Sequence, residues 1–258
     1  MVGFMRVVLA GSALAGLPAI AQLHSSDIAV GVVDGRIVTG VIDPDTGTPA
    51  FPWSVYLGTF GDLGPGFENF TSDPGFDSLG VFAPGTKIGF DILRALRSWD
   101  GSGFSTIPAE TIVIAKGGQQ AQTPASDSVV AGFVFGEANA GGKFHHHVGY
   151  TLTAPHASGV YLLELRLWSP TLEESKPFWI VFNQNEDPGV HQQAAQWVLD
   201  NLATCRPDCE GDGDLDVFDY LCFLGRFSVQ DPYADFEGDG DWDVFDFLAY
   251  QGSFAQGC

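Results

Sequence analysis

Two acidic stretches near the carboxyl end, residues 208–219 and residues 235–246, repeat one ligand pattern at an offset of 27 residues. Each has carboxylates at positions 1, 3, 5, 9 and 12 of a twelve-residue loop and a glycine at position 6, where the chain turns sharply. Calcium takes 6–8 oxygen ligands, and a loop with this spacing can surround one ion. We therefore expect two calcium ions, one held by Asp208, Glu210, Asp212, Asp214, Asp216 and Asp219, and one by Asp235, Glu237, Asp239, Asp241, Asp243 and Asp246.

The crowding of charge supports this interpretation. Six carboxylates within twelve residues repel one another unless a cation lies among them. The alternative, an acidic run that is merely solvated, would not reproduce the glycine and the ligand spacing twice. In Asp214 and Asp241, at position 7, the backbone carbonyl is the usual ligand.

A run of three histidines is the second candidate for metal chemistry. We expect one strand over residues 143–153, in which period-two alternation places His145 and His147 on one face. Two imidazoles at this spacing can hold zinc or copper when a third ligand is added. His24 could supply it, alone or with Asp27, and zinc is the favoured metal. The alternative is a polar stripe that faces solvent.

The elements that position these histidines are strands. Asp34-Gly35 lies between two alternating runs, 27–33 and 36–42, which predicts a hairpin with a type I′ turn. Strands without intervening helices indicate antiparallel pairing, and hence a mainly β fold, an antiparallel β-sandwich or jelly-roll-like domain. Further strands are expected at residues 53–59, 86–92, 110–115, 128–135, 160–168 and 178–182.

Helices are expected only after these strands. Asp187-Pro188 is a helix start, with Asp as the N-cap and Pro in the first turn, and one helix therefore closes the β region. One helix-like segment follows each acidic loop, at 217–227 and 244–254. The predicted organisation is a signal peptide, a β-sandwich-like binding domain, a linker and a calcium-binding module, at residues 1–21, 22–202, 203–207 and 208–258.

The amino terminus predicts export. Arg6, an apolar run over 7–20 and the small-x-small triplet 19–21 have the layout of a signal peptide, with a mature start at Gln22. The alternative is an uncleaved anchor, although no other stretch reaches membrane-spanning length. We expect a secreted or cell-surface protein without an integral membrane span. The net charge of −21 argues against partners such as nucleic acid or anionic lipid.

The tandem loops resemble the dockerin family, because each ends in Asp rather than Glu and precedes a single helix. The closing Gly257-Cys258 is similar to a bacterial variant of that module. The resemblance implies calcium-dependent attachment to a cohesin-like or other cell-surface partner. It also implies that loop positions 10 and 11 face this partner, unless they fill the module's own core: Val217, Phe218, Val244 and Phe245.

All four cysteines lie in this module, and exported chains favour disulfides, of which four cysteines allow three arrangements. Shifting Cys209 and Cys222 by the repeat offset reaches residues 236 and 249, which are not cysteines. Their joint absence from the second repeat favours a Cys209–Cys222 pair, and Cys205 and Cys258 would then join the ends of the module.

The β region is similar to a group of exported bacterial β-domain proteins, some of them tied to zinc limitation. The resemblance rests on the segments at residues 24–28, 144–152, 159–165 and 175–183. It implies zinc binding outside the cytoplasm, with His24, His145 and His147 at the matching positions.

Catalysis has little support in the sequence, and we expect a binding protein rather than an enzyme. There is no Gly-x-Ser-x-Gly or His-Glu-x-x-His motif, and no cysteine precedes residue 205. The competing function is carbohydrate binding or polysaccharide degradation, and a structural surface-layer role comes third. Candidate carboxylates for polysaccharide degradation are Asp91, Asp100, Glu110, Glu164 and Glu174. Candidate aromatics for sugar stacking, which could equally be core side chains, are Trp53, Trp99, Trp168 and Trp179.

Overall fold

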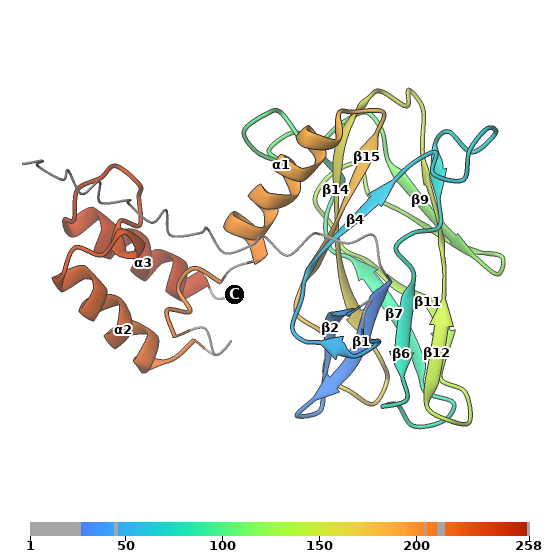
Figure 1. The fold of residues 1–258 in the computed structure, drawn as a ribbon, viewed down its shortest axis with the longest axis horizontal. Helices are drawn as coiled ribbons and strands as arrows, with labels where there is room; N and C mark the ends of the chain where they lie inside the picture. Colours follow the sequence, from blue (N-terminus) through green and yellow to red (C-terminus); the bar gives the residue numbers. More distant parts are fainter. Residues whose placement is uncertain (1–26, 44–45, 204, 211–214, 257–258) are drawn as a thin grey trace, which may run out of the picture.

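A computed structural model describes residues 27–43, 46–203, 205–210 and 215–256 (Figure 1). The described part is mainly β, with three sheets followed by three α-helices. Figure 1 shows α2 and α3 as a small helical unit beyond α1, separate from the sheets. The predicted mainly β fold class is thus confirmed, whereas the sandwich or jelly-roll assignment stays a prediction.

The first two strands form the predicted hairpin. β1 (Ile28–Val33) pairs with β2 (Arg36–Ile42) in antiparallel register, with Val33 opposite Arg36. Asp34 and Gly35 both have positive φ, 49° and 86°, as a type I′ turn requires.

Three sheets contain the strands. One has five strands in the order β12-β6-β1-β2-β3, and the second has four in the order β10-β9-β13-β5. The third has six, five of them in the order β11-β7-β14-β15-β4, and the sixth, β8, pairs with β14 outside this order. The remaining bounds are β3 (Pro49–Ala50), β4 (Val55–Thr59), β5 (Phe70–Thr71), β6 (Phe76–Leu79), β7 (Lys87–Ile92), β8 (Arg97–Ser98), β9 (Ile112–Lys116), β10 (Gln119–Gln122), β11 (Val130–Glu137), β12 (Lys143–His146), β13 (Gly149–Leu152), β14 (Gly159–Trp168) and β15 (Phe178–Gln184).

Pairing is not purely antiparallel, contrary to our expectation. β1 lies parallel to β6, and β15 lies parallel to β4. Parallel neighbours need long connections rather than tight turns. The chain supplies these connections with other strands, because β2 to β5 intervene between β1 and β6.

The main core lies between the sheets and is rich in phenylalanine. Phe76 of β6 stacks on Phe135 of β11 with ring centroids 4.3 Å apart, and Tyr150 of β13 contacts Phe182 of β15. These side chains are buried on the inward face of their strands. The core thereby fixes the relative position of the three sheets and of the strand ends that carry the histidines.

α1 (Pro188–Val198) covers the outer face of the six-stranded sheet. Asp187 caps it by accepting a hydrogen bond from the Gly189 N–H, as predicted. Its buried alanines, Ala194 and Ala195, belong to a second cluster with side chains of β4, β14 and β15. A π-helical turn, Leu199–Ala203, continues the helix, so the predicted linker begins later than residue 203.

The C-terminal unit contains α2 (Val217–Ser228) and α3 (Val244–Gln256), each directly after an acidic loop. Its core is aromatic, with the Phe223 and Tyr250 rings stacked 3.9 Å apart. The Cys209–Cys222 disulfide is confirmed. Cys205 is also disulfide-bonded; Cys258 lies outside the described residues, so their pairing stays a prediction.

No helix within the described residues is long and apolar enough to cross a membrane. The predicted signal peptide, residues 1–21, lies outside the described part of the chain, and export therefore stays a prediction.

Candidate metal centre

The histidine run lies where the chain passes from one sheet to another. The expected single strand over 143–153 is wrong, because it is two strands, β12 and β13, separated by His147 and Val148. β12 pairs with β6 in the five-stranded sheet and β13 pairs with β9 in the four-stranded sheet. The break occurs because the two halves pair with different sheets. His145 and His147 nevertheless lie on the same side.

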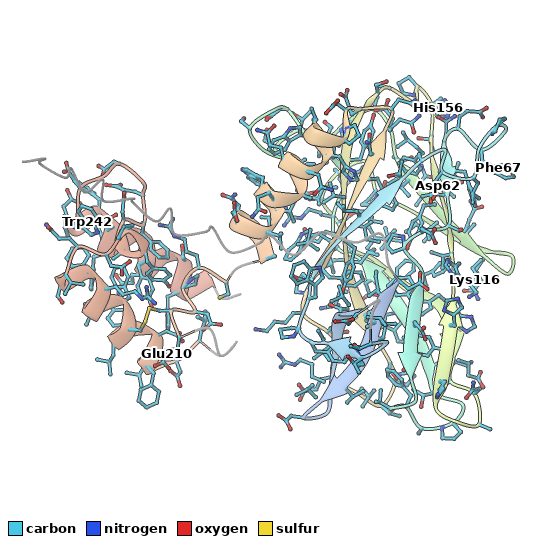
Figure 2. The ribbon with its side chains drawn as sticks, viewed as in Figure 1. Asp62, Phe67, Lys116, His156, Glu210 and Trp242 are labelled. Carbon is cyan, nitrogen blue, oxygen red and sulfur yellow. A yellow bond between two sulfur atoms is a disulfide. The ribbon has the colours of Figure 1, made fainter. Side chains whose placement is uncertain are left out.

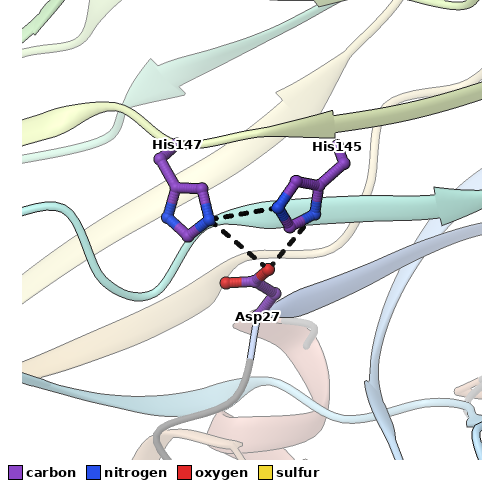
Figure 3. A group of neighbouring side chains, drawn as sticks. All are labelled: Asp27, His145 and His147. Carbon is purple, nitrogen blue, oxygen red and sulfur yellow. Dashed lines mark hydrogen bonds and ion pairs between the residues drawn. The ribbon is translucent and has the colours of Figure 1, made fainter.

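Three side chains converge at this break (Figure 3). The Nε2 atoms of His145 and His147 are 3.3 Å apart. Asp27, immediately before β1, places its Oδ2 3.4 Å from Nδ1 of His145 and 3.7 Å from Nε2 of His147. Among the described residues, this is the only group of three or more His, Cys, Asp or Glu whose ligand atoms all lie within 4.8 Å of one another.

A second layer of acceptors holds the His147 ring, and a carboxylate lies near that of His145. Nδ1 of His147 lies 3.0 Å from the Ser72 carbonyl oxygen and 3.0 Å from Oδ1 of Asp73. Nδ1 of His145 lies 3.6 Å from Oδ2 of Asp77, its cross-strand partner on β6. An Nδ1–H that faces an oxygen leaves Nε2 free with its lone pair, which is the tautomer that a metal ligand needs.

The turn before β6 fixes the carboxylate. The backbone N–H of Gly75 donates to Oδ1 of Asp27 at 2.8 Å, which leaves Oδ2 to face the imidazoles. A Cβ atom at residue 75 would lie 2.8 Å from both Oδ1 of Asp27 and Nδ1 of His147. Glycine therefore allows the turn to approach both side chains.

The geometry suits a small ion with nitrogen and oxygen ligands. Two ligand atoms bound to a tetrahedral zinc ion at 2.0–2.1 Å lie about 3.3 Å apart, and this is the separation of the two Nε2 atoms. The side chains of His145, His147 and Asp27 are 58%, 37% and 20% exposed, so an ion could enter from solvent.

The other histidines that the structure describes do not join this group. His24 lies outside the described residues, so its place relative to the pair is untested. His146 points to the opposite face of β12, where its ring lies parallel to that of Phe144. His191 lies on the buried face of α1, and its Nε2 is 2.8 Å from the Val181 carbonyl oxygen.

Sequence reasoning missed the supporting residues Ser72, Asp73, Gly75 and Asp77. Nothing in their local spacing marks them as partners of a histidine run some 70 residues away. A signal existed only in the acidic pair at 73 and 77 beside a glycine, and the register between β6 and β12 was needed to interpret it.

The first acidic loop is described only in part. Asp212 and Asp214 lie outside the described residues. At its end, Asp219 is buried and its two carboxylate oxygens accept hydrogen bonds from the backbone N–H groups of Glu210 and Asp216. Burial alone would raise the pKa of Asp219, but these N–H groups lower it.

The second loop is described completely, and two of its carboxylates accept several hydrogen bonds each from the loop's own backbone N–H groups. Asp235 accepts hydrogen bonds from the N–H groups of residues 238, 239 and 240. Asp246 accepts from those of residues 236, 237 and 243. No three of this loop's carboxylates have ligand atoms within 4.8 Å of one another, so they are less tightly gathered than the histidine group.

Charge still accumulates in this loop. Burial and then the negative charges of Asp239, Asp243 and Asp246 raise the pKa of Glu237. Arg206 supports the start of the loop by donating to the carbonyl oxygens of Asp235 and Phe236 and by lying over the Phe236 ring. A cation among the carboxylates would relieve their repulsion.

The apolar pairs at loop positions 10 and 11 are exposed, so the alternative that they fill the module's core is wrong. Phe218 and Phe245 are 56% and 57% exposed, and Val217 and Val244 are exposed beside them. Leu221 and Leu248, also related by the repeat offset, extend each pair by one helical turn. That this surface faces a partner stays a prediction.

Three of the carboxylates suggested for glycoside hydrolysis, those of Asp91, Glu164 and Glu174, form ion pairs. Arg166 bridges Asp91 and Glu174, at 3.0 and 2.7 Å. Burial raises the pKa of Glu164, although the Arg94 guanidinium opposes this shift.

The remaining two support turns and loops. Glu110 accepts a hydrogen bond from the Ala157 N–H, and Asp100 accepts from Ser102 and Gly103. The pKa of Asp100 is thereby lowered to about 2. An acid with so low a pKa is poorly suited to donating a proton to a leaving group.

The tryptophans suggested for sugar stacking pack against the protein. Trp179 is buried, Trp99 contacts Trp197, and the Trp53 indole N–H donates to the Val55 carbonyl. The Trp168 ring lies against Gly89, where a Cβ would come within 2.5 Å of it. These contacts do not favour the carbohydrate alternative.

Comparison of the chain with protein families, with curated proteins and with solved structures found no match.

Proposed function

We propose that this chain is an exported metal-binding protein whose β domain holds one zinc ion between Asp27, His145 and His147. The observation that carries the proposal is the 3.3 Å separation of the two Nε2 atoms, with the Asp27 carboxylate beside both rings. The oriented Nδ1 atom of His147 supports it, because a plain polar stripe has no need of oxygens behind the ring.

The donor set favours zinc over calcium or magnesium at this site. Imidazole nitrogens suit zinc, copper and nickel, whereas the hard cations prefer oxygen throughout. Zinc sites with three protein ligands keep a fourth position for water or another ligand. His24 is our candidate for that position, because three residues of extended chain span about 10 Å before Asp27.

Zinc titration of the metal-free full chain tests this proposal. We expect one equivalent to bind the β domain, and the double variant His145→Ala/His147→Ala to lose it. His156→Asn is the matched control, because His156 lies outside the group and asparagine tolerates its positive φ of 61°. Unchanged stoichiometry in the double variant would exclude the site. If His24→Ala weakens binding as well, His24 is a ligand.

We further propose that the C-terminal unit is a dockerin-like module that folds around two calcium ions and attaches the protein to a cell-surface partner. The duplicated ligand spacing supports calcium binding. The exposed apolar pairs at Val217, Phe218, Val244 and Phe245 support a protein partner, because paired apolar side chains at equivalent positions are otherwise costly to leave in water. Pull-down with a cohesin domain, with and without chelator, tests the attachment.

A further inference from the structure

A cavity of about 400 Å³ lies on the face of β12 opposite the metal group. It is lined by residues of β7, β9, β10, β11 and β12, so it opens between the six-stranded, four-stranded and five-stranded sheets. Figure 2 shows Lys116, one of its lining residues, at the edge of the β domain. The cavity is shallow and open to solvent, so it could seat a small ligand without enclosing it.

Two lysines from different sheets meet at this cavity. Lys87 comes from β7 and Lys116 from the end of β9. Basic residues are scarce in this chain, which has 11 Lys and Arg against 32 Asp and Glu. The placement of two of them around one opening is therefore a distinctive charge feature of the β domain.

These two lysines lack ion-pair partners in the part of the chain that the structure describes. Neither ammonium lies within 4.0 Å of a carboxylate, whereas Arg36, Arg94, Arg97, Arg166 and Arg226 all form ion pairs. Glu137 stands opposite Lys87 in the strand register and lines the same cavity, yet it is not paired with it. Two ammonium groups are thus available to a ligand.

The floor of the cavity is apolar and has a planar side. Val134 is half-buried and contributes apolar surface, whereas Phe135, which also lines the cavity, is 2% exposed. The His146 ring packs closely against Gly136, where a Cβ atom would lie 2.1 Å from Cδ2 of the ring. A ligand with an anionic end and an apolar or aromatic body would match both parts of this surface.

We propose that this cavity binds a small organic anion, a carboxylate or a phosphate monoester, between Lys87 and Lys116. The anionic group lies between the two ammonium groups, and the apolar body rests on Val134. Burial lowers the pKa of Lys116, so its ammonium is partly desolvated and gains more from a bound anion than a fully hydrated one does. This site is independent of the proposed zinc and calcium sites.

The experiment is a calorimetric titration of the metal-free full chain with phenyl phosphate, and in separate arms with benzoate, inorganic phosphate and uncharged benzamide. We expect saturable binding of phenyl phosphate or benzoate, and none of benzamide. The arms distinguish a phosphate site from a carboxylate site. Repeating the titration in the His145→Ala/His147→Ala variant should give the same affinity, because that pair lies on the other face of β12.

Variants locate the site. Lys87→Gln and Lys116→Gln should each weaken binding about fivefold, whereas Lys143→Gln should leave it unchanged, because Lys143 is exposed and does not line the cavity. Glu137→Gln should tighten binding by removing the nearest negative charge. The proposal is wrong if no anion saturates, if benzamide binds as well as the anions, or if the two cavity variants behave like Lys143→Gln.

Discussion

His145 and His147 place their Nε2 atoms 3.3 Å apart even though β12 ends between them. Strand alternation alone would leave side chains at i and i+2 roughly 7 Å apart, since each residue rises 3.2–3.4 Å along a strand. The two rings therefore lean toward each other across this spacing. The same break allows the Ser72–Gly75 turn to reach the back of His147.

Replacing Asp73 with alanine should weaken zinc binding about tenfold without removing a ligand. Its Oδ1 lies 3.0 Å from Nδ1 of His147 and helps to fix the ring and its tautomer. The loss should stay near the lower end of the range for such partners, because the Ser72 carbonyl remains as an acceptor. Competition with a chromogenic chelator measures the affinity. Asp34→Asn, which also removes one negative charge but lies in the exposed hairpin turn, should have no effect.

Gly75→Ala should lower zinc affinity by at least about tenfold while the β domain stays folded. The added methyl group would lie 2.8 Å from Oδ1 of Asp27, and the carboxylate must move away from the imidazoles to accommodate it. Gly159→Ala is the control, because the nearest atom to its added Cβ, on Tyr161, is 3.6 Å away. Equal zinc affinities of the two variants would show that the Gly75 turn does not position Asp27.

Glu237→Gln should raise the thermal stability of the C-terminal unit without calcium and reduce the stabilisation that calcium gives. Without calcium, the change removes repulsion from Asp239, Asp243 and Asp246, and the C-terminal unit should melt at a higher temperature. With calcium, it removes a ligand, and the calcium-induced rise in Tm should shrink. Thermal melts of the full chain in chelator and in excess calcium measure both effects. Glu137→Gln in the β domain should change neither, and a shift of the same sign in both conditions would contradict a calcium-binding role for Glu237.

The β domain should lose stability as pH falls below the unfolded-state pKa of His191. Burial lowers the pKa of His191 in the folded protein, although the Val181 carbonyl opposes this shift. Protons therefore bind the unfolded state more readily, and the stability that neutral His191 contributes is present above pH 6.5 and is lost as pH falls from there through the folded-state pKa.

The variant His191→Gln should make the Tm of the β domain less dependent on pH between 7 and 5, because glutamine keeps a donor for the carbonyl but does not titrate. Differential scanning calorimetry at several pH values measures this. If wild-type and variant lose Tm in parallel, His191 does not carry the effect.

Local signals in the sequence were sufficient where neighbouring residues determine the structure. Asp34-Gly35 specifies the first hairpin through its positive φ values, and Asp187-Pro188 specifies the start of α1. The strand expected over 143–153 failed because its two halves pair with different sheets, and pairing partners are not encoded locally. Asp77 reaches His145 only because β6 lies between β1 and β12, a placement that no spacing within the chain reveals.

The passage of the chain from β12 to β13 has a mechanical consequence for the proposed zinc site. Two ligands flank the point where the backbone leaves one sheet for another, and the third stands at the entrance to β1. An ion bound there would cross-link the start of β1 to the end of β12, two segments that are distant along the chain. Loss of the metal would then loosen the junction between the sheets of β12 and β13. The chain at Asp27, before β1, would be the first part of the domain to detach.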